Sequence, residues 1–134
     1  MFLGPGDLVR GGEKLAANGA EKLAANAVAK GGAYKDVKGI TGNEAHHMPA
    51  NSVSPLSTGK GPACSICKAD HAETASYGST REARAYREEQ RKLIEQGKFR
   101  EAQEMDIRDL QSKFGSKYDE AIQQMRDYTR SLGL

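Results

Sequence analysis

Residues 42–51 read Gly-Asn-Glu-Ala-His-His-Met-Pro-Ala-Asn, and they hold two of the three histidines in a chain of 134 residues. The third histidine, His71, lies in the segment Ala-Asp-His-Ala-Glu at residues 69–73. Because neighbouring side chains alternate along an extended segment, His46 and His47 are expected to point to opposite sides. Gly and Pro interrupt the sequence around all three histidines, and a long irregular segment in a small domain is usually functional or held by a metal. We therefore expect the functional site in this region.

The composition limits the classes of protein that the chain can be. Its length allows one small domain and a tail. A mean hydropathy of -0.70 with no long apolar run predicts no membrane span. Net charge is +2, which is not the strongly basic footprint of an obligate nucleic-acid binder. Two cysteines are too few for a disulfide scaffold, and Met1–Arg10 lacks the apolar stretch of a signal peptide.

The amino-acid composition changes along the chain and divides it into segments. Residues 1–38 are rich in alanine, with Glu-Lys-Leu-Ala-Ala-Asn at 13–18 returning at 21–26, and they are expected to form a helical linker. Residues 39–134 are expected to form the functional domain, and within it residues 79–134 form a helical scaffold.

Helical periodicity in the C-terminal scaffold predicts three helices. The first follows a capping box made by Ser79 and Glu82 and ends at Gly97. The second is predicted over residues 99–113, and the third from Ser116. These helices carry most of the bulky apolar residues, so the fold class is expected to be an α-rich α+β protein.

Two adjacent histidines can take the two roles that a metal-dependent nuclease needs, metal ligand and general base. One imidazole can hold a cation that stabilises charge on a phosphate, while its neighbour, with a pKa near 6.5, takes a proton from the attacking water. A third histidine on a following helix can complete the metal site. A purely structural cluster remains the alternative for these histidines.

The His-His pair and Asp70-His71 resemble the HNH/endonuclease VII superfamily, in particular the nuclease toxin domains at the C-termini of bacterial polymorphic toxins. The resemblance covers roughly residues 40 to 80. It implies a small ββα-metal (HNH-like) centre, a hairpin and a helix around one divalent ion, packed on the C-terminal helices. In that family the first histidine is a ligand and the second is the general base.

Carried over to this chain, the resemblance makes His46 a metal ligand, His47 the general base, and His71 a ligand or phosphate contact. Asp70 is a further ligand or a group that orients a histidine, and Asn51 braces the hairpin loop. Two alternatives to this assignment stay open. Asp70 could instead be a helix N-cap, and other residues could take its place as metal ligands. Those substitutes are Glu44, Glu73 and Thr74.

The resemblance also implies a cofactor, partners and a place of action. The cofactor is a divalent metal ion (Mg, Mn, Ni or Zn). The partners are a DNA substrate, a cognate immunity protein and a larger parent toxin or delivery module, to which residues 1–38 would be the pre-toxin segment. The protein is then an antibacterial effector, secreted or delivered, that acts in the cytoplasm of the target cell.

Arginines of the first scaffold helix could contact the substrate. Arg84, Arg87 and Arg91 follow at spacings of three and four and share one stripe, which could track a phosphate backbone. Glutamates on the same helix can pair with them, so an ordinary solvated face is the alternative. No element is suited to reading bases, and we expect cleavage with little sequence preference.

A competing class of function uses the cysteines. Cys64, Cys67 and His71 have the spacing C-x-x-C-x-x-x-H and could hold a structural zinc together with His46 or His47. The chain would then be a non-catalytic, zinc-stabilised interaction module.

Overall fold

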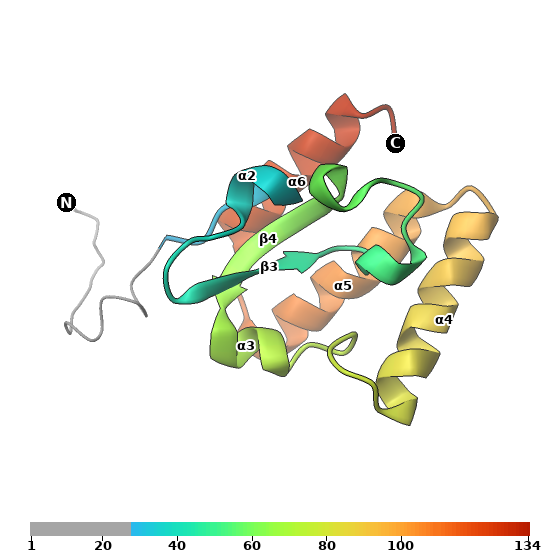
Figure 1. Cartoon of the computed structure of the whole chain (residues 1–134), viewed down its shortest axis with the longest axis horizontal. Helices are drawn as coiled ribbons and strands as arrows, with labels where there is room; N and C mark the ends of the chain where they lie inside the picture. The colour runs from blue at the N-terminus through green and yellow to red at the C-terminus, as the bar shows by residue number, and fades with distance from the viewer. Residues whose placement is uncertain (1–27) are drawn as a thin grey trace.

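The computed structural model describes residues 28–134, which form a mixed α+β fold (Figure 1). The expected α-rich α+β class is confirmed, and the alanine-rich repeat at 13–26 lies outside the described residues. In chain order the strands and helices are β2 (Gly31–Ala33), α2 (Tyr34–Val37), β3 (Asn43–His47), β4 (Pro62–Cys67), α3 (Lys68–Ala72), α4 (Arg81–Glu95), α5 (Phe99–Phe114) and α6 (Asp119–Ser131). The short 3-10 turns η1 (Asn51–Val53) and η2 (Thr58–Lys60) lie in the connection between β3 and β4.

The strands form an antiparallel sheet in the order β2-β4-β3. His46 lies opposite Cys64 in the β3–β4 pair, and Gly31 lies opposite Cys64 in the β2–β4 pair. Only glycine fits at position 31, because a Cβ there would lie 1.8 Å from the carbonyl oxygen of Ala121 in α6. Residues 31–37 are therefore part of the folded unit, which begins before the expected boundary between residues 38 and 39.

The hydrophobic core lies between the sheet and helices α5 and α6, which run behind β4 and β3 in Figure 1. Directly opposed residues of antiparallel strands share a face, so His46 projects to the same side as Cys64. Full burial of each large core side chain contributes about 1.5–3 kcal/mol. The buried core cluster consists of Met48, Cys64, Ile66, Ile107, Leu110, Tyr118, Ala121, Ile122 and Met125.

The three C-terminal helices largely match the prediction, but α4 and α6 begin at other residues than predicted. Helix α4 begins at Arg81, and its N-cap is Thr80 rather than Ser79, because the Thr80 hydroxyl accepts from the N–H of Ala83 at 3.1 Å. Helix α5 matches the predicted span to within one residue. Helix α6 begins at Asp119 instead of Ser116, since turns at 115–118 bring Tyr118 into the core. No helix within residues 28–134 is long and apolar enough to span a membrane.

A buried polar network joins α4 to α5. The Tyr86 hydroxyl donates to Asp106 Oδ1 at 2.8 Å, and Gln90 Nε2 donates to Asp106 Oδ2 at 2.7 Å. Asp106 is fully buried, and this burial raises its pKa to about 7, with Asp109 adding to the rise and the bonds from Gln90 and Tyr86 opposing it. Both carboxylate oxygens are thus engaged by α4.

Two buried glutamines hold the backbone that follows the His-His pair. Gln90 Oε1 accepts from the N–H of Ala50 at 3.3 Å, and Gln103 Nε2 donates to the carbonyl oxygen of Met48 at 2.9 Å. Gln103 Nε2 also donates to Thr129 Oγ1 at 2.8 Å. The scaffold helices therefore fix the direction in which the chain leaves β3.

Candidate active site

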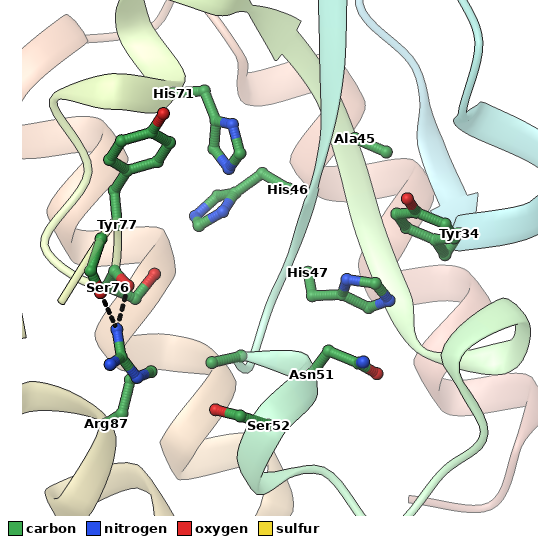
Figure 2. Close-up of a pocket in the computed structure, with 12 residues that line it drawn as sticks. Tyr34, Ala45, His46, His47, Asn51, Ser52, His71, Ser76, Tyr77 and Arg87 are labelled. Carbon is green, nitrogen blue, oxygen red and sulfur yellow. Dashed lines mark hydrogen bonds between the residues drawn. The ribbon is translucent and has the colours of Figure 1, made fainter. Parts of the chain in front are cut away.

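A pocket of about 370 Å³ opens beside the end of β3, and all three histidines line it (Figure 2). His46 and His47 come from consecutive positions of β3, and His71 comes from α3. As expected for an extended segment, the two neighbours point to opposite sides: His46 turns toward His71, and His47 turns toward Tyr34. The strand thus separates two imidazoles that both reach one pocket.

His46 is buried without a partner for one of its ring nitrogens. The residue is 3% exposed, and within the described residues its Nε2 is the one buried side-chain nitrogen or oxygen that lacks a hydrogen bond. The pKa of His46 is lowered to about 3, mainly by burial and in smaller part by the nearby His71, His47 and Lys113. His46 is therefore neutral at neutral pH, with a ring nitrogen that has no partner among residues 28–134.

His71 faces His46 and is held from behind by a carboxylate. The two ring centroids lie 5.1 Å apart with the planes tilted by 58°. His71 Nδ1 lies 2.6 Å from Glu44 Oε1. An ionised carboxylate only accepts hydrogen bonds, so Nδ1 carries the hydrogen and Nε2 is the nitrogen left for another partner. Glu44 therefore orients His71 in the way that carboxylates orient metal-binding imidazoles.

Asp70 is not brought to the His46–His71 pair. Its Oδ2 lies 2.7 Å from Lys117 Nζ and accepts a hydrogen bond from the Tyr118 hydroxyl at 2.6 Å. Burial acts to raise the pKa of Asp70, but the bonds from Lys117 and Tyr118 outweigh it and lower the pKa. The alternative role as an N-cap is wrong, because Asp70 lies inside α3, whose N-cap is Cys67. The carboxylate beside the histidines is Glu44 instead.

Two neighbouring imidazoles could supply nitrogen ligands to a divalent cation. Two imidazoles converge, one has an unpartnered buried nitrogen, and the other has its far nitrogen engaged by a carboxylate. No third His, Cys, Asp or Glu within residues 28–134 completes a cluster around them. Among residues 28–134, two imidazoles are therefore available to such an ion, and Asp70 is bound elsewhere.

His47 occupies a separate environment on the other side of β3. Its Nε2 lies 2.9 Å from the carbonyl oxygen of Thr58, which can only accept, so Nε2 carries the hydrogen and Nδ1 keeps a lone pair. Burial lowers the pKa of His47, with the Thr58 bond opposing the shift and His71 adding to it. A neutral imidazole with a free Nδ1 lone pair can accept a proton.

The connection between β3 and β4 is braced by a short polar contact. Asn51 Nδ2 donates to Thr58 Oγ1 at 3.2 Å and joins the two 3-10 turns. Asn51 therefore braces the hairpin connection, as the resemblance implies, and steadies the residue whose carbonyl binds His47.

The predicted arginine stripe divides into different environments. Arg87 lines the pocket, and its Nη1 donates to the carbonyl oxygens of Ser76 at 2.6 Å and Gly78 at 2.8 Å (Figure 2). Arg84 donates instead to the carbonyl of Ser79. Arg91 is exposed and pairs with glutamates of its own helix, so it matches the solvated-face alternative. Of the three, Arg87 is the arginine that reaches the histidines' pocket.

The cysteines do not assemble the alternative zinc site. Cys64 is fully buried, and its thiol lies 3.8 Å from the sulfur of Met125 in the core. Burial also raises the pKa of Cys64 far above its usual range. Cys67 is three residues further along β4 and therefore points to the other face. Within residues 28–134, Cys64, Cys67 and His71 form no metal-binding group.

Several residues of the site carry no recognisable signal in the sequence. Tyr34 lies in the segment expected to be a linker, and Gln90 and Gln103 lie on helices with many polar residues. The sequence analysis names Glu44 only as a substitute metal ligand. Its place two residues before His46 on a strand nevertheless puts both side chains on one face. That spacing is the one signal that could have identified a site residue.

No protein-family model, curated protein or solved structure matches this chain.

Proposed function

We propose that this chain is a metal-dependent endonuclease that hydrolyses DNA phosphodiesters with little sequence preference. The observation that carries the proposal is the convergence of His46 and His71, with Glu44 behind His71, in a pocket that His47 also lines. The pair could supply nitrogen ligands to a metal ion, and the third imidazole, with its free lone pair, could supply the general base for metal-assisted phosphodiester hydrolysis.

The order of the elements supports the same proposal. Strands β3 and β4 pair antiparallel and lead directly into α3, which carries His71. This order agrees with the hairpin and helix that a resemblance to HNH/endonuclease VII nucleases implies. We accordingly extend the proposal to an antibacterial toxin domain that belongs to a larger parent or delivery module. A cognate immunity protein would block it in the producing cell.

His46 and His71 are the residues that would hold the cation. Imidazole ligands favour Zn or Ni over Mg and Mn among the divalent ions expected. When bound, such an ion stabilises the negative charge that develops on the scissile phosphate. An ion held by two protein ligands would still be able to bind an oxygen of the scissile phosphate.

The chain's own residues supply the remaining chemistry. His47 Nδ1 takes a proton from the attacking water while Nε2 stays hydrogen-bonded to Thr58. Because His47 is neutral at neutral pH, it is ready to accept that proton. Arg87, held by two backbone carbonyls at the pocket wall, provides a fixed positive charge for a phosphate.

A plasmid-cleavage assay tests the proposed activity. The parent is incubated with supercoiled DNA and Zn, Ni, Mn or Mg ions, with and without chelator, beside His47→Ala and Cys67→Ala. We expect cutting by the parent that chelator abolishes, loss in His47→Ala with an unchanged circular dichroism spectrum, and retention in Cys67→Ala. Absence of cutting with every ion, or cutting of RNA alone, would contradict the proposal.

Metal binding can be measured without any activity. Isothermal titration with Zn or Ni should give one site in the parent, and His46→Ala and His71→Ala should each abolish it. Asp70→Asn is the matched comparison, because Asp70 bonds to Lys117 and Tyr118 and not to the histidines. Binding that survives both histidine substitutions, or disappears in Asp70→Asn with the fold intact, would show a different ligand set.

A further inference from the structure

Tyr34 lies in a segment that the resemblance does not cover, yet its ring contacts the proposed general base. The rings of Tyr34 and His47 have centroids 4.2 Å apart and planes inclined by only 11°, so they are stacked face to face. Figure 2 shows Tyr34 on the side of His47 that faces away from His46 and His71. One face of the His47 imidazole is therefore covered by an aromatic ring.

The edge of the same imidazole is held by the segment that enters β4. A Cβ on Gly61 would lie 2.8 Å from His47 Cδ2, which is closer than real Cβ atoms approach, and at a tight 3.3 Å from Nε2. The backbone of Gly61 is extended, with φ -65° and ψ 139°, so glycine is needed here for room and not for its dihedral freedom. The bare backbone at Gly61 lets the ring edge approach.

The parts that surround His47 are also joined to one another. The N–H of Tyr34 donates to the carbonyl oxygen of Gly61 at 2.9 Å, which links the residue stacked on His47 to the residue at its edge. The Thr58 carbonyl fixes Nε2 from a third direction. An imidazole with a covered face, a confined edge and a bonded nitrogen has little freedom to rotate, and its Nδ1 lone pair keeps one direction.

We propose that Tyr34 is a positioning residue, which stacks on His47 and fixes the direction of its Nδ1 lone pair, while Gly61 provides the space that this orientation needs. The inference rests on the proposed function, in which His47 is the general base. A misplacement of about 1 Å of a catalytic group can lower a rate by about a hundredfold. Tyr34 acts on the rate through His47 and does not itself touch the phosphate.

The first test compares Tyr34→Leu, which keeps an apolar side chain without stacking, with Tyr34→Phe, which keeps the ring. We expect Tyr34→Leu to lower kcat by about ten- to a hundredfold with KM within about twofold of the parent. Tyr34→Phe should restore kcat to within about twofold. Equal loss in both variants would assign the effect to the hydroxyl and overturn the stacking role, and an unchanged kcat in Tyr34→Leu would overturn the proposal outright.

A second readout needs no activity. Long-range ¹H–¹⁵N NMR spectra of the metal-free protein report which nitrogen of His47 carries the hydrogen and how its ring protons are shielded. Tyr34→Leu should remove the shielding by the stacked ring and mix the two tautomers, and Tyr34→Phe should preserve the parent signals. If the parent cuts no DNA, the proposed function fails, while these spectra still decide whether Tyr34 sets the His47 ring.

A matched pair of glycines provides an independent arm if Tyr34→Leu fails to fold. Gly61→Ala should displace the His47 signals and lower kcat, because its Cβ meets the imidazole. Gly59→Ala should change neither, since its Cβ would lie at an ordinary 3.6 Å from Lys35 Cβ. Unchanged His47 signals in Gly61→Ala, or equal effects from both substitutions, would overturn the role of Gly61.

Discussion

Asp106 should make the stability of this fold fall as the pH rises from about 4 to about 7. Its pKa rises from 3.8 to about 7 in the folded chain because the carboxyl group is buried. Between these values the folded state holds a proton that the unfolded state has released. The contribution of Asp106 is therefore fully present below about pH 4 and is lost as the pH rises through about 7. At about 1.4 kcal/mol per pKa unit, the loss amounts to about 4 kcal/mol.

The substitution Asp106→Asn removes this titration while keeping the size of the side chain. The free energy of unfolding of Asp106→Asn, minus that of the parent, should increase by about 4 kcal/mol between about pH 4 and about pH 7. The difference between the two free energies is the quantity to measure. His46 changes the stability with pH in the direction opposite to Asp106, but it does so equally in the parent and in the variant, so its effect cancels. Its lowered pKa, about 3, contributes stability that is present above about pH 6.5 and lost as the pH falls toward 3.

Urea denaturation followed by circular dichroism, repeated across this pH range, gives both free energies. Asp127→Asn is the control, because Asp127 is exposed and its pKa is lowered by Arg130 and Gln123. That control should show no gain over the parent as the pH rises. A difference between Asp106→Asn and the parent that stays constant with pH, or that changes in the opposite direction, would refute the link between the burial of Asp106 and its proton.

Three further outcomes follow from other contacts. Glu44→Gln should weaken Zn or Ni binding by about ten- to a hundredfold in isothermal titration, because the amide orients His71 less strongly, and unchanged affinity would argue against that role. Arg87→Gln should raise KM for DNA and reduce the salt dependence of binding. Arg91→Gln on the exposed face should match the parent. Equal effects of the two substitutions would mean that only the net charge of the helix matters, and not the place of Arg87 in the pocket. Gln103→Ala should lower the free energy of unfolding in urea by about 1–3 kcal/mol because the carbonyl of Met48 loses its donor, and a smaller loss would mean that water replaces the glutamine.

The local patterns in the sequence predicted the scaffold and the direction of the histidines. Helical periodicity located α5 to within one residue, and alternation along a strand placed His46 and His47 on opposite sides. These features depend only on neighbours in the chain. The predicted starts of α4 and α6 were less accurate. The hydrogen bond of the Thr80 hydroxyl determines where α4 begins, and the packing of Tyr118 in the core determines where α6 begins.

The partners of the histidines depend on contacts between distant segments, which a single sequence does not reveal. Tyr34 meets His47 only because β2 adds to the far side of β4 and brings α2 close to η2. The resemblance makes Asp70 a metal ligand or a group that orients a histidine, but Lys117 and Tyr118 bind it from a segment almost fifty residues away. Adjacency in the chain places a side chain on an element and does not determine what that side chain meets.

The pairing of β2 with β4 limits where the fold can be cut for expression. Lys30 contributes its carbonyl to the N–H of Ser65 at 2.7 Å, and β2 continues the pairing from there. A fragment that starts at residue 39 would lack this strand and would turn β4 from a central strand into an edge. Exposed edges recruit strands from other molecules. Such a fragment should form dimers and larger aggregates in size-exclusion chromatography, and a fragment that starts before Lys30 should not.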